Sequence, residues 1–280
     1  MYFLAALQYT LYYTPNWIGE ELEHLYESLW LNSALHPRWN VTETGAGTVQ
    51  ESQGKLILRV ADGHAGYSNA QITDYSTQRL NFDWRPPLTL TVTAWATGDP
   101  VGTAGFGFWN HPFSPDIKRL PSLPRALWWF FGSPPNNMQL AHDVPGFGWK
   151  AATLDATRPS ALALAPLALP TVLLMRVPAL YARLWGMIQR RLHISETLLD
   201  PALLTERHTY TLAWRAEGAT FAIDGQTVHE TAFAPVGQMG CIAWIDNQYA
   251  VVTPQGRFGW GIVPVEREQA LVLEEVQIQT

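Results

Sequence analysis

Short segments in which apolar and polar residues alternate recur along most of the chain. Clear examples are Lys55-Leu-Ile-Leu-Arg-Val60 and the β-branched run over residues 88–95. Successive side chains of a strand point to opposite faces, so this period of two predicts strands with one buried face. Later in the chain, Asp224-Gly225 supplies the residues that a tight hairpin turn requires. The pattern predicts a sheet protein rather than a helical one.

Further runs of the same kind extend the strand pattern to the end of the chain. They lie at residues 102–110, 209–214, 220–223, 240–245 and 271–278. Many short strands with few helices are typical of a sandwich or barrel, and a chain of 280 residues is long enough to bury one such core. We therefore expect one all-β jelly-roll sandwich over residues 38–280. Residues 1–37 are expected to form an N-terminal arm and helix packed on it.

Residues 157–203 interrupt this pattern and are expected to form a helical insertion. No acidic residue lies between Asp155 and Glu196, and an uncharged run rich in Leu and Ala precedes apolar residues at helical spacing over 178–193. An apolar face beside a basic face is typical of a helix that lies on a membrane surface. The basic residues expected to contact a membrane or a partner are Arg176, Arg183, Arg190 and Arg191.

Three roles fit this insertion. It could pack on the sandwich with its arginines in solvent, bind a membrane surface or a partner, or form a lid over a site. Pro166 and Pro170 interrupt the uncharged run, which argues against a helix that spans a bilayer. Any membrane contact is therefore expected to be peripheral.

Composition narrows the classes of function. Charged residues make up 15% of the chain and the net charge is -6, which argues against nucleic acid as the partner because phosphate binding requires a basic surface. The single cysteine, Cys241, lies in an apolar run, so we expect a buried free thiol. The apolar start of the chain has no basic flank and no small-residue cleavage site, so no signal peptide is evident. A cytoplasmic protein is expected.

Three segments resemble a known family. They are Trp39 with Gly54-Lys-Leu-Ile-Leu58, the strand Gly105-Phe-Gly-Phe-Trp109, and the stretch from His208-Thr-Tyr-Thr-Leu-Ala-Trp214 to Phe221-Ala-Ile-Asp-Gly225. The last of these is similar to the pattern H-x-Y-x-x-x-W followed by F-x-x-D-G-x-x-V. Together they resemble glycoside hydrolase family 16, the laminarinases and β-glucanases. The resemblance implies a concanavalin A-like jelly roll.

The resemblance does not extend to the catalytic residues of that family. Family 16 enzymes carry a Glu-x-Asp-x-x-Glu strand, whose nucleophile and acid/base lie about 5–5.5 Å apart for retaining hydrolysis. The equivalent residues here, 126–131, read Ala-Leu-Trp-Trp-Phe-Phe and include no carboxylate. Standard family 16 glycosidase activity is therefore not expected, and whether another reaction is catalysed stays open.

The groove that the resemblance implies would be lined by aromatic and amide side chains. Tryptophan faces stack on sugar rings and amides bond hydroxyl groups, although aromatic residues also fill sandwich cores. The chain has 13 tryptophans. The catalytic candidates for a non-standard reaction are His142, Asp143 and Asp246. The expected ligand-binding residues are Trp109, Asn110, His111, Trp128, Trp129, Trp149, Lys150, Trp244, Asn247 and Tyr249.

Related jelly rolls often hold a structural calcium ion between their first and last strands. Glu274 with carbonyls near Asn32 is the corresponding candidate, and a solvent-facing glutamate is the alternative. No other cofactor is expected. The sequence therefore favours a noncatalytic or atypical glucanase-like jelly roll that binds a carbohydrate or an apolar small molecule. The alternatives are a glycoside hydrolase or lyase with non-standard carboxylates, and a membrane-surface or partner-binding module.

Overall fold

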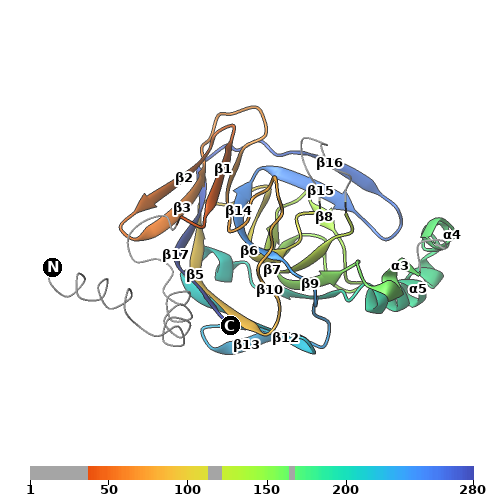
Figure 1. Cartoon of the computed structure of the whole chain (residues 1–280). Helices are drawn as coiled ribbons and strands as arrows, with labels where there is room; N and C mark the ends of the chain where they lie inside the picture. Colours follow the sequence, from red (N-terminus) through yellow and green to blue (C-terminus); the bar gives the residue numbers. More distant parts are fainter. Residues whose placement is uncertain (1–36, 113–121, 164–167) are drawn as a thin grey trace, which may run out of the picture.

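The computed structural model describes residues 37–112, 122–163 and 168–280. Within them, two seven-stranded sheets pack face to face (Figure 1). This arrangement confirms the predicted all-β jelly-roll sandwich. The arm expected over residues 1–37 lies, apart from its last residue, outside the described residues.

The front sheet includes the strand that the family 16 resemblance aligned with the catalytic positions, and its neighbouring strands all pair antiparallel. Strands distant in sequence are neighbours here, since β4 pairs with β14, so the sheet is complete only when late parts of the chain join early ones. In spatial order its strands are β1 (Asn40–Thr44), β4 (Asn69–Thr73), β14 (Gly240–Asp246), β6 (Thr103–Trp109), β7 (Arg125–Gly132), β9 (Gly148–Asp155) and β10 (Ser195–Leu199).

The back sheet is also antiparallel and covers the inner face of the front sheet. The hairpin predicted at Asp224-Gly225 joins β12 to β13, and both turn residues have positive φ, 49° and 78°. In spatial order the strands are β13 (Gln226–Thr231), β12 (Gly218–Ile223), β11 (His208–Arg215), β5 (Leu88–Thr97), β17 (Gln269–Gln279), β3 (Lys55–Val60) and β2 (Gly47–Ser52).

A small third sheet and four short helices are attached to this sandwich in the described part of the chain. The small sheet pairs β15 antiparallel with β16 and parallel with β8. Its strands are β16 (Phe258–Ile262), β15 (Gln248–Val252) and β8 (Asn137–Met138). The helices are α3 (Pro159–Leu162), α4 (Ala168–Leu174), α5 (Pro178–Arg191) and α6 (Ala202–Thr205).

Large aromatic side chains fill the space between the two large sheets. The rings of Trp129 and Trp149 in the front sheet meet Tyr210 of the back sheet, with centroids 5.0 and 5.8 Å apart. Trp214 is fully buried and its indole N–H donates to the carbonyl of Pro235 at 2.7 Å, which gives a buried indole the partner it needs. Cys241 lies in the same core as a free thiol, as expected.

The predicted insertion over 157–203 contains the helices but is not wholly helical. Residues 195–199 form β10, which pairs with β9 and becomes the edge of the front sheet. The helices instead bury a second, smaller core that includes Met175, Trp185 and Ile194. The insertion is therefore tied to the sandwich both by a strand and by apolar packing.

Two glycines of β6 bring its backbone close to the neighbouring strands. Gly107 has φ of +146°, and a Cβ atom there would lie 2.5 Å from the carbonyl oxygen of Leu127 and 2.6 Å from the Cα atom of Trp128. At Gly105 a Cβ atom would lie 2.2 Å from the carbonyl oxygen of Trp129. Only glycine allows this approach, because the atoms in the way are backbone atoms that cannot rotate aside.

We predict that Gly107→Ala lowers the free energy of unfolding by about 3 kcal/mol or more. The new Cβ atom would push β6 away from β7, and alanine would be strained at this positive φ. Gly54→Ala is the matched control, because Gly54 also has positive φ but a Cβ atom there would meet no other atom within 4 Å. It should cost only about 1–2 kcal/mol. Urea unfolding followed by circular dichroism measures both, and equal losses would refute the close-approach argument.

Candidate functional site

An aromatic cluster covers the outer face of the front sheet, which is the face turned away from the back sheet. Alternation along the strands places Trp109 of β6, Trp128 and Phe130 of β7, and Ile242 and Trp244 of β14 on this face. Phe130 and Trp244 are buried, whereas Trp109 and Trp128 are only partly buried. Three of the predicted ligand-binding tryptophans are thus brought together.

The rings of this cluster contact one another and are held by hydrogen bonds at its borders. Trp128 lies at its centre, with ring centroids 5.4 Å from Trp244 and 6.0 Å from Trp109. The indole N–H of Trp244 donates to Thr103 Oγ1 at 2.9 Å, and that of Trp109 donates to the hydroxyl of Tyr75. The cluster is therefore a fixed apolar layer rather than a set of free side chains.

The outer face of β7, all of whose residues are described, has no carboxylate. Cross-strand pairing with β6 places Ala126, Trp128 and Phe130 on that face. These are the positions where the family 16 resemblance would require the catalytic pair. This strand therefore supplies neither the nucleophile nor the acid/base carboxyl group that retaining glycosidases use.

Two of the predicted ligand-binding tryptophans face the opposite way. Trp129 and Trp149 alternate with outer-face residues and point into the core between the sheets, where they are fully buried. The prediction that they line a groove is wrong for this reason. Adjacent aromatic residues such as Trp128 and Trp129 must lie on opposite faces of a strand.

Three polar candidates have their hydrogen-bonding groups occupied within the protein. Asn247 accepts from the backbone N–H of Ser68 at 2.9 Å and donates to the carbonyls of Gly66 and Val263, both at 3.1 Å. Asn110 accepts from the N–H of Arg125 at 2.9 Å and donates to the carbonyl of Leu123 at 2.9 Å. These amides join loops to strands.

The third, His111, is buried with positive φ of 45°. Its Nδ1 lies 3.1 Å from the hydroxyl of Tyr75, and its ring packs against Trp109. These contacts place it beside the aromatic cluster as a supporting residue.

Lys150 forms a buried pair with Glu196 on the outer face. Lys150 Nζ lies 3.4 Å from Glu196 Oε1, and Glu196 Oε2 accepts from the N–H of Ala141 at 2.9 Å. Only 1% and 3% of the two side chains is exposed, so a ligand cannot reach Lys150. Burial lowers the pKa of Lys150 and raises the pKa of Glu196.

The three catalytic candidates lie in two different environments. His142 and Asp143 are exposed in a loop, where the ring of His142 packs against Tyr181 with centroids 5.1 Å apart. Asp246 is buried, and its Oδ1 accepts from Thr103 Oγ1 at 2.8 Å, Thr103 N at 3.2 Å and Gln248 N at 3.1 Å. Burial raises the pKa of Asp246 to about 6 despite these donors.

Glu274 is engaged in ion pairs. Its carboxylate lies 2.5 Å from Arg207 Nε and 3.8 Å from Lys55 Nζ. Asn32, the other part of the predicted calcium site, lies outside the described residues. In the described ranges, no group of three or more His, Cys, Asp or Glu residues is arranged to hold a metal ion.

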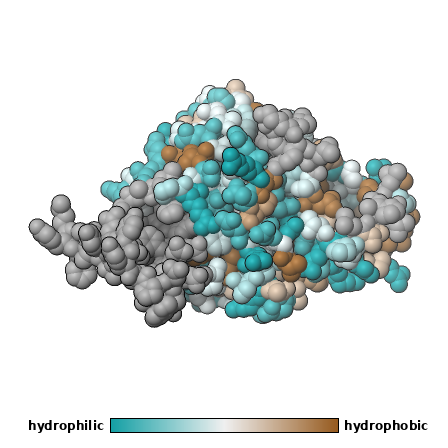
Figure 2. Space-filling view, viewed as in Figure 1, coloured by the Kyte–Doolittle hydropathy of each residue, from teal (hydrophilic) through white to brown (hydrophobic). Residues whose placement is uncertain are grey.

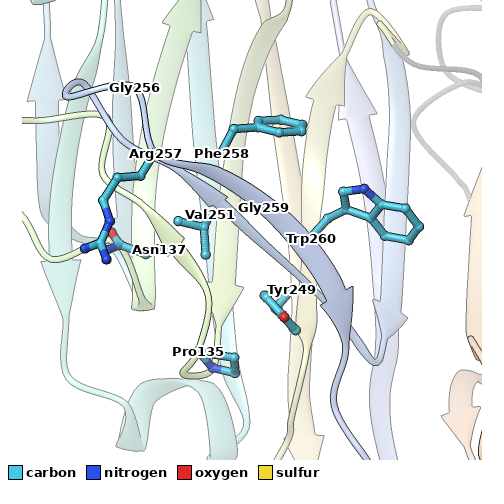
Figure 3. A pocket seen from close by; sticks show the side chains of 9 residues that line it. All are labelled: Pro135, Asn137, Tyr249, Val251, Gly256, Arg257, Phe258, Gly259 and Trp260. Atoms are coloured by element: carbon cyan, nitrogen blue, oxygen red, sulfur yellow. The ribbon is translucent and has the colours of Figure 1, made fainter. Parts of the chain in front are cut away.

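A pocket of about 680 Å³ opens beside the small sheet (Figure 3). Tyr249, one of the predicted ligand-binding residues, lines it, and the other lining residues were not predicted from the sequence. The lining residues are Pro135, Asn137, Tyr249, Val251, Gly256, Arg257, Phe258, Gly259 and Trp260.

The hairpin β15–β16 beside this pocket exposes large aromatic side chains. Phe258 and Trp260 are 80% and 70% exposed, and they point the same way from β16 (Figure 3). Gly259 and Gly261 alternate with them, and Tyr249 packs against Gly261, where a Cβ atom would lie 2.8 Å from its ring. The sequence Phe-Gly-Trp-Gly-Ile carries a signal for this arrangement, because glycine supplies no side chain to cover the other face.

The four arginines predicted to contact a membrane or a partner are all exposed and lie at or near α5. They are remote in sequence from the hairpin, but α4 lies against its turn, since a Cβ atom at Gly256 would lie 2.6 Å from Val172. The helical insertion and the pocket are therefore neighbours.

For Asp246 we predict a pH-dependent stability that the Asp246→Asn variant removes. The folded state binds the carboxyl proton more tightly than the unfolded chain, whose pKa is near the ordinary 3.8. Protonated Asp246 therefore contributes about 3 kcal/mol to the free energy of unfolding. This contribution is fully present below pH 4 and is lost as the pH rises through about 6. Asparagine retains an acceptor for all three Oδ1 hydrogen bonds.

Thermal unfolding of both proteins between pH 4 and 7 measures this effect. Asp74, whose pKa burial also raises to about 6, is present in both and cancels in the difference. A constant difference between the two proteins across the pH range would contradict the prediction.

For the buried ion pair we predict that Glu196→Gln lowers the free energy of unfolding by about 3 kcal/mol, because it leaves the Lys150 ammonium buried without a counter-charge. Adding Lys150→Met to this variant should recover most of the loss. Urea unfolding at pH 7 of the wild type, the single and the double variant measures the effect. A double variant less stable than the Glu196→Gln variant would contradict the explanation that the loss comes from the unpaired Lys150 ammonium.

Comparison with known proteins gives matches to solved structures alone. No family model and no curated protein matches the chain. Its backbone is similar to an endo-acting O-glycanase of the human gut microbiota, with 12% identity, 90% of this chain and 99% of that chain covered, and a TM-score of 0.49. The Emp47p carbohydrate recognition domain has 9% identity, coverages of 89% and 91%, and a TM-score of 0.47.

A third similar structure is an immunostimulatory antigen and pseudo β-1,3-glucanase of Mycobacterium tuberculosis. Its sequence is 10% identical, the alignment covers 88% of this chain and 93% of that one, and the TM-score is 0.47. At these identities and TM-scores the likeness does not extend to the roles of residues.

Proposed function

We propose that this protein binds carbohydrate at the pocket of the β15–β16 hairpin and does not hydrolyse it by the paired-carboxylate mechanism. The observation that carries the proposal is the exposure of Trp260 and Phe258 beside a pocket lined by Tyr249, Asn137 and Arg257. Sugars present C–H faces that stack on aromatic rings and hydroxyl groups that need hydrogen bonds. The hairpin offers both kinds of group: the exposed rings of Phe258 and Trp260 lie on one face of β16, and Tyr249, Asn137 and Arg257 lie on the other.

The exposure of these two rings argues for a binding role. Large aromatic side chains are mostly buried in folded proteins, and a contiguous exposed apolar patch is a common mark of a binding surface. Val252 and Ile262 extend the patch on the same face of the hairpin, and are 41% and 40% exposed. Packing among the described residues does not account for this patch, so we assign it to a ligand.

The polar groups of the pocket suit a hydroxyl-rich ligand. Asn137 offers both a donor and an acceptor, and the guanidinium of Arg257 offers several donors in a fixed plane. Figure 3 shows Arg257 and Asn137 close together on one side of the pocket, away from the rings of Phe258 and Trp260. A purely apolar small molecule would form no hydrogen bonds with these groups, whereas a sugar could bond both.

The hairpin is held in place by backbone and side-chain hydrogen bonds. Thr253 accepts from the N–H of Arg257 at 3.2 Å through its hydroxyl, and Asn136 accepts from the N–H of Ala250 at 3.0 Å. Because the turn and the strand are already fixed, less conformational entropy is lost when a ligand binds.

The enzyme alternative has less support. Asp246 is buried with its oxygens engaged in internal hydrogen bonds. Asp143 lies in an exposed loop, and Glu196, the carboxylate whose pKa the Asp143 charge raises, is buried and paired with Lys150. We therefore favour binding without turnover.

We predict that Trp260→Ala raises the Kd for the bound oligosaccharide about tenfold or more, which corresponds to about 1.4 kcal/mol of lost binding energy. Isothermal titration calorimetry with β-glucan, galactan and xylan oligosaccharides measures it without relying on tryptophan fluorescence. Trp95→Ala is the matched control, because Trp95 is a partly buried tryptophan of the back sheet, beside Lys55. It should leave the Kd unchanged.

Absence of saturable binding for every sugar in the panel would overturn the proposal, as would equal affinity of the wild type and Trp260→Ala. The Asp143→Asn and Asp246→Asn variants should bind like the wild type. Product formation by the wild type that either variant abolishes would instead favour the enzyme alternative.

A further inference from the structure

The end of the helical insertion exposes a second group of large apolar side chains. They come from α4, from the turn that follows it, and from α5. Each is between 37% and 52% exposed, and they are Leu173, Leu174, Val177, Leu180 and Met187. Figure 1 shows α4 at the outer edge of the molecule, and Figure 2 shows hydrophobic and hydrophilic residues side by side at that end. We call these five residues the apolar tip.

The apolar tip is additional to the face that α5 already buries. The inward side of α5 packs Trp185, Leu184 and Ile188 into the second core with Met175 and Ile194. The indole N–H of Trp185 donates to the carbonyl of Leu140 at 2.9 Å, which fixes the rotation of the helix. A helix with one buried apolar face does not need a second one for folding.

Basic residues lie beside the apolar tip. Within the described residues, Arg176, Arg183, Arg190 and Arg191 form no salt bridge, although all are exposed. No Asp or Glu occurs in sequence between Asp155 and Glu196. On a helix of 3.6 residues per turn, Arg183 and Arg190 lie within one turn of Leu180 and Met187, so charge and apolar surface adjoin.

We propose that the apolar tip and its arginines dock this protein on an anionic phospholipid surface. The apolar side chains would enter the boundary between headgroups and acyl chains while the guanidinium groups bind lipid phosphates. No helix in the described part of the chain is long and apolar enough to cross a membrane, so the contact is peripheral. An acidic protein partner would match the arginines but would not account for the apolar side chains between them.

The docking surface adjoins the hairpin that forms the sugar pocket. Val172 of α4 lies against Gly256 in the hairpin turn. Docking would therefore hold the pocket near the membrane surface. The inference does not rest on the proposed sugar binding, because the two surfaces use different residues.

Co-sedimentation with vesicles tests the proposal. We expect the wild type to bind vesicles of 70% phosphatidylcholine and 30% phosphatidylglycerol, and to bind pure phosphatidylcholine vesicles at least tenfold more weakly. The double variant Arg183→Gln/Arg190→Gln should lose tenfold or more of the affinity for the anionic vesicles, since each basic residue near such a surface contributes about fivefold. Salt should weaken binding by the wild type.

Two control variants separate this surface from general effects of charge and folding. Arg215→Gln/Arg267→Gln removes the same charge from exposed positions elsewhere and should change vesicle affinity less than twofold. Leu173→Gln/Leu174→Gln should weaken binding about as much as the arginine variant, with circular dichroism melting unchanged.

Absence of wild-type binding to anionic vesicles would overturn the inference, and so would equal losses in the two arginine double variants. Trp260→Ala should bind vesicles like the wild type. Loss of sugar binding without loss of vesicle binding would therefore leave this inference intact, and the reverse would leave the proposed function intact.

Discussion

The close contact between the glycines of β6 and the indole rings beside them determines both faces of the front sheet. Gly105 pairs with Trp244 and Gly107 with Trp128, and no Cβ atom stands between the rings and the β6 backbone. The tryptophans can therefore lie across β6 and contact each other. The alternate residues of β6, Phe106 among them, fill the core on the other face. One strand thus supports two aromatic layers, and its glycines are as necessary as its phenylalanines.

A consequence of this arrangement is that side chains on the outer face of the front sheet bury one another. Trp244 and Phe130 are buried although they face away from the sandwich core, and Met138 of the small sheet packs on the cluster. The polar residues at the edge of this layer, such as Asp246 and Asn247, then form hydrogen bonds within the protein because burial would otherwise cost too much. Their role is to attach the small sheet, since Asn247 bonds the carbonyl of Val263 directly after β16.

Sequence periodicity predicted the sandwich because alternation is a property of single strands. The family 16 resemblance located the strand without carboxylates, since β7 carries the residues that it aligned with the catalytic positions. Periodicity could not tell which of Trp128 and Trp129 faces outward, because both neighbours are apolar and either register satisfies the pattern. Lys150 was misread for a related reason, since its partner Glu196 lies in a segment expected to be helical and joins the sheet only through β10.

The exposed apolar surfaces described above belong to the attached segments and not to the sandwich. The sandwich buries or half-buries its own aromatic residues on both faces of β7. Phe258 and Trp260 lie instead on the small sheet, and the apolar tip lies on α4 and α5 and the turn between them. Each attached segment has its own anchor, Asn136 for the hairpin and Trp185 for the helices, so packing among the described residues does not use its outer face. Recognition by attached segments on a rigid scaffold is a common division of labour in proteins. Val172 of α4 lies against Gly256 of the hairpin turn, so the two attached segments are neighbours while each keeps its own anchor on the sandwich.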